Sequence, residues 1–273
     1  MKYSIIIPVF NGVEKILRSI ESIQRQSSVL TGDDEFRCIV VDGASTDGTA
    51  DVVRSISDAR IELISEPDSG MYDALSKGLL KSEGDICCYL PAGETFESSA
   101  FSTVSEIFAN HVAIHWLTGV MVEKNKNQQV IDTFLPPPFK RKYLLKGLYG
   151  TRLHVVQQES TFWRMELNNS IQFDTLKSCQ LAGDYFLWKC FAKRYQLIVV
   201  NSILCSFTRE EGQLSSQVKG AYRSELRELR DNPTLFDEIW ATVLRKTYRR
   251  IKNARRAKGI VRFDCETNQW KLS

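Results

Sequence analysis

The first ninety residues contain four short apolar segments, each separated from the next by an amphipathic or polar stretch. The stretch Val13–Gln26 has apolar residues at positions 16, 17, 20 and 23, the spacing of one helix face. A second helix is predicted over Met71–Ser82. This alternation predicts an α/β, Rossmann-like fold with a mainly parallel central sheet and helices on both faces. The predicted strands are Ser4–Val9, Phe36–Val41, Arg60–Ser65 and Asp85–Leu90.

Turns rich in polar residues or glycine follow the predicted strands. Open parallel sheets bind ligands at the carboxyl ends of their strands, so these turns are the first candidates for a binding site. In one of them, Thr46 or Asp47 is expected to cap the helix that follows. The four turns are Pro8–Asn11, Asp42–Thr46, Glu66–Gly70 and Pro91–Glu94.

The second half of the chain is less regular. The triple proline Pro136–Pro138 predicts a surface connection, and Leu181–Lys193 has the pattern of an amphipathic helix that begins beside Asp184. We therefore predict one domain over residues 1–216 and a helical, basic C-terminal extension over 217–273.

The composition, with 43% hydrophobic and 25% charged residues, is typical of a globular protein. No apolar run approaches the roughly 20 residues of a spanning helix. The segment Tyr3–Pro8 is also too short for the core of a signal peptide. Seven cysteines without a CxxC pair indicate reduced core residues, and the three histidines do not form a ligand pattern. We expect a cytoplasmic protein without a histidine-rich metal site.

The net charge of +3 is unevenly distributed. Nine Lys and Arg but no acid lie between Ile239 and Phe263, which leaves 27 bases against 33 acids in the rest of the chain. On a helix, Trp240, Leu244, Tyr248 and Ile251 would form one apolar stripe bordered by these bases.

The chain contains neither a GxGxxG nor a GxxxxGK[ST] motif, which argues against a dinucleotide oxidoreductase or a P-loop enzyme. Four carboxylates instead lie at predicted strand or helix ends, where an acid can accept hydrogen bonds from a base or a ribose. Spacing alone also allows plain turn and cap roles for such acids. The four are Asp42, Asp68, Glu94 and Asp184.

Several motifs in order resemble those of inverting family-2 glycosyltransferases. They are Ser4-Ile5-Ile6-Ile7-Pro8-Val9-Phe10-Asn11, Val41-Asp42-Gly43-Ala44-Ser45-Thr46-Asp47-Gly48-Thr49, Ser65-Glu66-Pro67-Asp68-Ser69-Gly70-Met71-Tyr72-Asp73-Ala74-Leu75 and Gly84-Asp85-Ile86. The later segments Gln157–Arg164 and Leu181–Asp184 resemble the acceptor-side motifs of bacterial O-antigen and capsular polysaccharide members. The resemblance covers about residues 3–216.

The resemblance implies a GT-A fold, a nucleotide-sugar donor, here expected to be UDP-linked, and displacement with inversion. Asp184 matches the position of the general base, which must be ionised within reach of the acceptor hydroxyl. The dipole of the helix that Asp184 opens would favour ionisation, although a simple cap role is the alternative. The matching nucleotide-binding positions are Pro8, Phe10, Asn11, Asp42, Gly43, Asp68, Ser69, Gly70 and Asp73.

One segment departs from the family pattern. The family usually has paired acids that hold a divalent metal on the diphosphate, whereas this chain has Leu90-Pro91-Ala92-Gly93-Glu94. Mn²⁺ or Mg²⁺ could be held weakly through Glu94, or the enzyme could work without metal, or the chain could be a non-catalytic scaffold that binds nucleotide sugars. Without metal, a cation such as Lys77, Arg164 or Arg209 would have to stabilise the leaving group.

The acceptor is expected to be a saccharide or a lipid-linked saccharide in cell-surface polysaccharide biosynthesis. Gln158, Glu159 and Trp163 are the candidates to contact it, with Trp163 or Trp188 stacking on a sugar ring unless these tryptophans belong to the core. The segment 207–215 resembles the family's closing loop, and mobility is expected over Thr208–Ser216.

The basic segment 239–263 predicts contact with an anionic membrane, each base near the surface adding about 1 kcal/mol. The protein would then be peripheral on the inner face of the cytoplasmic membrane. One alternative is that the stripe packs on the catalytic domain. The other is an adaptor that binds nucleic acid, but no nucleic-acid motif supports it and the rest of the chain is acidic.

Overall fold

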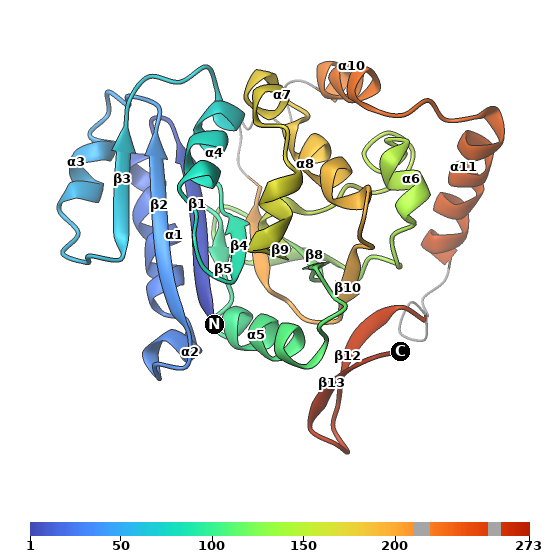
Figure 1. Ribbon diagram of the computed structural model, residues 1–273, viewed down its shortest axis with the longest axis horizontal. Coiled ribbons are helices and arrows are strands. Elements are labelled where there is room, and N and C mark those ends of the chain that lie inside the picture. Colours follow the sequence, from blue (N-terminus) through green and yellow to red (C-terminus); the bar gives the residue numbers. More distant parts are fainter. Residues whose placement is uncertain (210–218, 251–257) are drawn as a thin grey trace.

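The computed structural model describes residues 1–209, 219–250 and 258–273 (Figure 1). The described part of the chain is built on a nine-stranded sheet with the strand order β13-β12-β10-β6-β9-β4-β1-β2-β3. Strands β1 to β4 pair in parallel, and β9 runs antiparallel to both of its neighbours, β4 and β6. A mainly parallel α/β sheet is therefore confirmed.

The N-terminal half alternates strands with helices as the sequence predicts. Its register places Val9, Asp42 and Ser65 side by side, so that the first three strands end in one row. The elements are β1 (Lys2–Val9), α1 (Val13–Gln24), α2 (Ser27–Leu30), β2 (Glu35–Asp42), α3 (Thr49–Arg54), β3 (Ile61–Ser65), α4 (Met71–Leu80) and β4 (Ile86–Tyr89).

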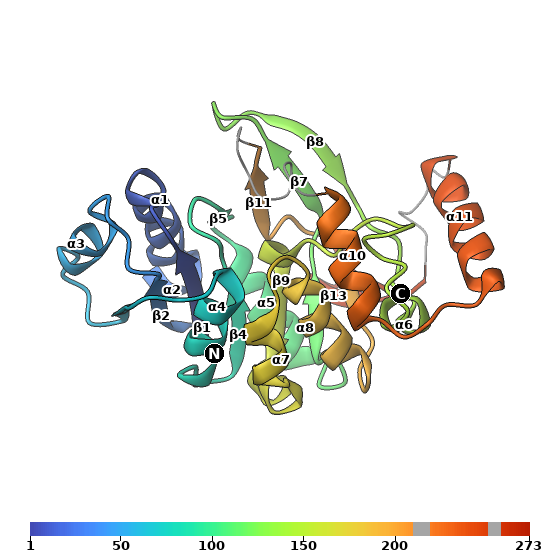
Figure 2. The same ribbon diagram turned by 90° about the horizontal axis from the view of Figure 1, so that it is seen from above.

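Helices cover both faces of this part of the sheet, which explains the apolar run Ile5–Val9 in β1. On one face the ring of Tyr3 stacks on Phe101 of α5 (Ala100–Asn110), with 4.1 Å between the ring centroids. On the other face α4 lies so close to β1 that a Cβ on Gly78 would be 2.4 Å from Ile6. Figure 2 shows α1 and α4 on opposite sides of the strands.

The second half adds further strands to the large sheet and forms a small second sheet. The small sheet has the order β5-β11-β7-β8 and projects from the body, most clearly at the β7–β8 hairpin (Figure 2). The remaining elements up to residue 209 are β5 (Thr95–Phe96), β6 (Trp116–Thr118), β7 (Met121–Lys124), β8 (Val130–Phe134), α6 (Arg141–Leu145), η1 (Gln158–Ser160), β9 (Thr161–Arg164), η2 (Met165–Ser170), α7 (Phe173–Ser178), α8 (Gly183–Ala192), β10 (Ile198–Val200) and β11 (Cys205–Thr208).

The C-terminal segment is not purely helical, which corrects the prediction for 217–273. Helices α10 (Lys219–Leu229) and α11 (Leu235–Arg250) are followed by the hairpin β12 (Ile260–Asp264) and β13 (Gln269–Leu272). β12 pairs in parallel with β10, and Ile260 and Val261 are fully buried. The chain end thus completes the edge of the central sheet.

The described residues contain no helix that is both long enough and apolar enough to cross a membrane. All seven cysteines are unpaired, and every one except the exposed Cys265 is buried, as predicted. Among the described residues, no group of three or more His, Cys, Asp and Glu side chains is arranged to hold a metal ion.

Candidate active site

The carboxyl end of β2 places Asp42 at the centre of the predicted nucleotide-binding loops. Its side chain is fully buried and accepts a hydrogen bond of 2.7 Å from the Ser65 hydroxyl and longer ones, 3.2 to 3.3 Å, from the Ser45 amide. The adjacent Gly43 amide donates to the carbonyl of Val9. These contacts fix the carboxylate in the row of strand ends.

The loop after β1 is tied to the loop after β2. Asn11 has a positive φ of 48°, accepts the Thr46 amide at its side-chain oxygen and donates its own amide to the Ser45 hydroxyl. Pro8 lies inside β1, while Phe10 is exposed at its end. Pro8, Phe10, Asn11, Asp42 and Gly43 therefore come from two loops that form one surface.

The loop after β3 packs against the same surface. The Asp68 carboxylate accepts the Gly70 amide and lies where a Cβ on Gly43 would be only 2.5 Å from its oxygen. Gly70 has φ 129°, a conformation that L side chains rarely adopt. Asp68 and Gly70 thus lie close to Gly43, as the strand-end argument predicts.

Asp73 and Ser69 bind one another at the start of α4. The Ser69 amide and hydroxyl both donate to Asp73 at 2.9 Å. Burial opposes ionisation, but these two hydrogen bonds and the charges of Lys77 and Lys177 lower the pKa of Asp73. One Asp73 oxygen thus accepts the backbone amide of a residue that precedes the helix, an arrangement similar to a capping box.

Asp47 has a similar local role that the sequence predicts only in part. Its carboxylate accepts the Thr49 amide in the first turn of α3, and also the Val13 amide at the start of α1. The residue that directly precedes α3 is Gly48. Asp47 therefore caps two helix starts and is not free to contact a ligand with both oxygens.

Asp184 lies in the first turn of α8, where the sequence places it. The Tyr185 amide donates to Asp184 Oδ1 at 2.7 Å, and the Tyr222 hydroxyl of α10 lies 3.3 and 3.4 Å from the two carboxylate oxygens. Burial raises the pKa of Asp184 to about 6, despite these hydrogen bonds. The carboxylate is consequently still mostly ionised at neutral pH, but much more basic than an exposed aspartate.

Tight packing joins Asp184 to the strand-end loops. Gly183 lies against Tyr72 of α4, because a Cβ at this glycine would be 2.5 Å from the ring. The Tyr72 hydroxyl donates to the Leu181 carbonyl, and the Gln180 side chain lies beside Gly70. The start of α8 therefore adjoins the start of α4, and Asp184 lies next to the loop after β3.

Glu225 of α10 is a residue that the sequence motifs do not single out. Its carboxylate accepts the backbone amides of Gln180 and Leu181 at 2.7 Å and that of Ala182 at 3.2 Å. These are the amides that precede α8, so Glu225 caps the helix that carries Asp184. Nothing local in the sequence shows this, because 45 residues separate Glu225 from Gln180.

Of the residues predicted to contact the acceptor, two are polar side chains near Asp184 and one is part of the hydrophobic core. Gln158 accepts the Tyr89 hydroxyl at 2.5 Å, and the neighbouring Glu159 is buried and accepts the side-chain amide of Gln157. Burial raises the pKa of Glu159, and the nearby charge of Asp184 adds to this. Gln158 and Glu159 thus belong to the surroundings of Asp184.

Trp163 and Trp188 belong to the core. Trp163 is fully buried on β9 and donates its indole N–H to Asn168, while Trp188 of α8 is 2% exposed and packs against it. A side chain without accessible surface cannot stack on a bound sugar in this arrangement. The prediction that Trp163 contacts the acceptor is therefore wrong, because the ring fills the space between the sheet and α8.

Glu94 does not stand free at the end of its strand. Its side chain is buried, and one carboxylate oxygen accepts the Thr208 amide of β11 at 2.8 Å. Among the described residues, Glu94 belongs to no group of three or more His, Cys, Asp and Glu side chains that could hold a metal ion. These residues do not fit a metal held by protein carboxylates alone.

Two of the three basic side chains proposed to stabilise the leaving group without metal form ion pairs with acids of this chain. Lys77 is paired with Glu66, and Arg209 with Glu123. Arg164 donates to the carbonyls of Ile114 and Phe108 and lies over the Phe108 ring. Most of the predicted closing loop 207–215, and of the range 208–216 where mobility is expected, lies outside the described residues, which end at residue 209 and resume at 219.

Comparison with known proteins agrees with the sequence motifs. A sequence model of "Glycosyl transferase family 2" matches residues 4–168. A PGL/p-HBAD biosynthesis glycosyltransferase of Mycobacterium tuberculosis is 27% identical over 164 residues, which cover 55% of this chain and 61% of that protein. Glycosyltransferase AglE of Haloferax volcanii is 33% identical over 90 residues, or 32% of this chain and 29% of its own. The chain thus spans less than two thirds of the length of these relatives.

Solved structures share the fold at low sequence identity. S. aureus TarS 1-349 in complex with UDP-GlcNAc has a TM-score of 0.60 at 17% identity, covering 80% of this chain and 61% of that one. Mannosyltransferase PcManGT from Pyrobaculum calidifontis, in complex with GDP-Man and Mn2+, has a TM-score of 0.60 at 17% identity. That alignment covers 92% of this chain and 70% of PcManGT.

Proposed function

This chain belongs to glycosyl transferase family 2 and has the GT-A architecture, and we propose that it transfers a sugar, with inversion, from a nucleotide-sugar donor to a saccharide or lipid-linked saccharide. The observation that carries this proposal is Asp184, a carboxylate with a pKa of about 6 beside the strand-end loops. A base with a pKa near the working pH combines ionisation with proton affinity.

The proposed reaction needs one base and one leaving group. Asp184 accepts the proton of the acceptor hydroxyl while that oxygen forms a bond to the anomeric carbon of the donor. The bond from the anomeric carbon to the diphosphate oxygen breaks on the opposite face, and the nucleoside diphosphate leaves with the electron pair. Attack from the opposite face inverts the anomeric configuration.

The donor is proposed to lie over the strand-end loops, with Asp42 and Asp68 toward the nucleoside and Gly70 beside the diphosphate. Their convergence at Gly43 supports this placement. We propose a UDP-linked donor, and GDP-linked sugars are the first alternative, because the similar solved structures are complexes with UDP-GlcNAc and GDP-Man.

Metal dependence stays a prediction. One Glu94 oxygen is bound to the Thr208 amide, so any Mn²⁺ or Mg²⁺ would need most of its ligands from the diphosphate and water. Calorimetric titration of UDP with Mn²⁺ or with EDTA tests this. Affinity that requires metal and is lost in Glu94→Ala would support a site at Glu94, and equal affinity under both conditions would contradict it.

We further propose a role in cell-surface polysaccharide assembly of the O-antigen or capsular type, at the inner face of the cytoplasmic membrane. Support comes from α11, which exposes Phe236, Ile239, Trp240 and Val243 and also carries exposed bases. The apolar stripe differs from the predicted one, because Leu244 packs against the core. Tyr248 and Ile251 have side chains outside the described part.

The Asp184→Asn variant tests the enzymatic proposal. Release of nucleoside diphosphate from a panel of UDP-, GDP- and dTDP-sugars is measured with saccharide acceptors, alongside nucleotide affinity. We expect turnover to fall by at least about 10³-fold with affinity nearly unchanged, because the base acts mainly in the transition state. Asp174→Asn, at an exposed position in α7, is the matched control. Turnover retained in Asp184→Asn would exclude this residue as the base.

A further inference from the structure

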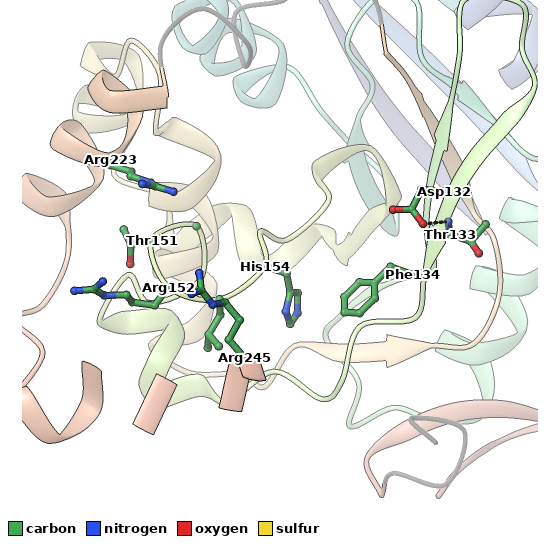
Figure 3. A pocket seen from close by; sticks show the side chains of 10 residues that line it. Asp132, Thr133, Phe134, Thr151, Arg152, His154, Arg223 and Arg245 are labelled. Carbon is green, nitrogen blue, oxygen red and sulfur yellow. Dashed lines mark hydrogen bonds between the residues drawn. The ribbon is translucent and has the colours of Figure 1, made fainter. Parts of the chain in front are cut away.

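A pocket of about 420 Å³ lies between the β7–β8 hairpin, the loop Gly150–His154 and helices α10 and α11. Figure 3 shows Arg223 of α10 and Arg245 of α11 pointing toward this loop from opposite sides. Arg152 also lines the pocket, but its guanidinium group extends away from the loop (Figure 3) and donates to Glu238. The pocket is built by elements far apart in the sequence.

Two of the pocket's arginines have no acidic partner in the part of the chain that the structure describes. Arg152 is paired with Glu238 at 2.9 Å, whereas neither Arg223 nor Arg245 forms an ion pair within the described residues. The acid that lines the pocket, Asp132, lies on the β8 side and accepts the Thr133 amide. Two unpaired guanidinium groups beside a concave surface favour an anionic ligand, because their planar forks match phosphate oxygens.

His154 closes the pocket on the side of the hairpin. Its ring lies among Phe134, Phe139 and Tyr149, and its Nε2 is buried without a hydrogen-bond partner in the described structure. Burial lowers the pKa of His154 to about 4, so the ring is neutral at physiological pH. The ring therefore adds no charge to the pocket wall, and the positive charge of the pocket comes from the arginines.

The pocket adjoins the proposed base on the side away from the donor loops. Tyr222 contacts Asp184 through its hydroxyl, and the same ring lies 3.4 Å from where a Cβ on Gly150 would be. Tyr222 thus separates the pocket wall from Asp184, whereas Tyr72 lies between Asp184 and the nucleotide loops. A ligand in the pocket would therefore lie on the α10 side of Asp184, with Tyr222 between them.

We propose that this pocket binds a phosphate or diphosphate group of the acceptor, held by Arg223 and Arg245. This rests on the proposed glycosyltransferase function and specifies its acceptor as a phosphorylated molecule. The phosphate could belong to a lipid diphosphate or to a soluble sugar phosphate, and the two sources share the same recognition chemistry. The donor's diphosphate is a separate group, bound on the other side of Asp184.

The test uses the full chain saturated with the nucleoside diphosphate that it binds, so that the donor site is already filled. Pyrophosphate is titrated calorimetrically into wild type, into the double variant Arg223→Gln/Arg245→Gln and into the control Arg227→Gln/Lys246→Gln. The control removes the same charge from exposed neighbours on the same two helices that do not line the pocket. Farnesyl diphosphate and glucose 1-phosphate are titrated in the same way.

We expect the Kd for pyrophosphate to rise at least about tenfold in the pocket variant, because two charge-assisted contacts are lost, and less than about twofold in the control. Tighter binding of farnesyl diphosphate than of glucose 1-phosphate identifies a lipid source, and the reverse identifies a soluble one. Equal weakening in both double variants means general charge attraction and overturns the proposal, as does no binding in wild type. Failure of any nucleotide to bind in the first step would instead count against the proposed function.

Discussion

The Asp184 carboxylate is held in surroundings that favour its protonated form, and its pKa of about 6 gives a prediction for the pH dependence of turnover. Only the ionised form can accept the proton of the acceptor. We therefore expect kcat/KM to fall about tenfold per pH unit below about pH 6 and to level off above it. A pH–rate profile measures this, and a profile that stays flat down to about pH 4.5 would contradict the assignment of the base.

The raised pKa of Asp184 also makes the stability of the fold depend on pH. Stability falls as the pH rises, whereas turnover is expected to increase. The folded chain holds the Asp184 proton more tightly than the unfolded chain, because the pKa rises from 3.8 to about 6 on folding. The free energy of unfolding contributed by this group thus decreases as the pH rises through that window. Asp184→Asn should accordingly be at least as stable as wild type at neutral pH, so its lost turnover cannot be attributed to unfolding.

Glu225 acts on Asp184 from the C-terminal segment, and its negative charge is one cause of the raised pKa. We expect Glu225→Gln to move the acid limb of the kcat/KM profile to lower pH, because the repulsion is removed while the side-chain carbonyl can still accept a backbone amide. Glu228→Gln, on an exposed part of α10, is the control. An acid limb that stays in place would mean that Glu225 only holds α8.

Gly183 is required by the close approach of α8 to Tyr72, where a Cβ would lie 2.5 Å from ring atoms. Gly183→Ala should lower the free energy of unfolding by about 1–3 kcal/mol, the usual cost of overpacking, and reduce turnover by displacing Asp184. Gly220→Ala, in α10 with no neighbour within 4 Å of its Cβ, should be neutral or slightly stabilising. Chemical denaturation of both variants measures the difference.

At the scale of elements, the sequence predicts the N-terminal half well. Strands β1 and β2 are buried over most of their length, so each contains a short apolar run, Ile5–Val9 or Cys38–Val41, whose carboxyl end can be located. The strand-end rule applied to these runs is enough to predict that Asp42 and Asp68 lie close together. Local pattern suffices here because sequence neighbours are also neighbours in space.

The C-terminal half could not be predicted in the same way, because its contacts are long-range. The amide caps of Glu225 and the pairing of β12 with β10 join segments about 45 to 60 residues apart. The role of Trp163 is equally hidden, because an aromatic side chain looks the same in the sequence whether it stacks on a sugar or fills a core. Only the packing of Trp163 between the sheet and Trp188 of α8 distinguishes these roles.

The terminal hairpin is part of the sheet, so its removal should be costly. Truncation after residue 258 would expose the partners of Ile260 and Val261, two fully buried side chains. At about 1.5–3 kcal/mol for each such side chain, we expect the free energy of unfolding to fall by about 3–6 kcal/mol. Phe263→Ser, at a 42% exposed position of the same strand, should change it far less. Equal stability of the truncated chain would show that the hairpin contributes no packing energy.

At the scale of the whole molecule, the C-terminal segment connects the proposed site to an exposed surface. Its helix α10 supplies Tyr222 and Glu225 at Asp184, while α11 is anchored on α6 through the buried Asp237, which pairs with Lys142 and Lys146. The same helix presents the apolar residues Phe236, Ile239 and Trp240 to solvent. The pocket between the two helices thus has the proposed base on one side and this apolar face nearby.

This exposed face predicts binding to anionic membranes through α11. Ile239 and Trp240 are 62% and 44% exposed, and inserting them between lipid headgroups would bury apolar area while the bases contact the headgroups. In sedimentation with phosphatidylglycerol–phosphatidylcholine vesicles, Ile239→Ser/Trp240→Ser should reduce the partition coefficient at least about tenfold.

The control removes two exposed apolar side chains elsewhere. Leu30→Ser/Val112→Ser, on α2 and after α5, should bind like wild type. Raising the salt from about 0.05 to about 0.5 M should weaken binding of wild type and control alike, because the contribution of the bases is screened. Binding that is unaffected by the α11 substitutions would show that this face has another partner, and a lipid-linked acceptor would then have to reach the arginine pocket without help from α11.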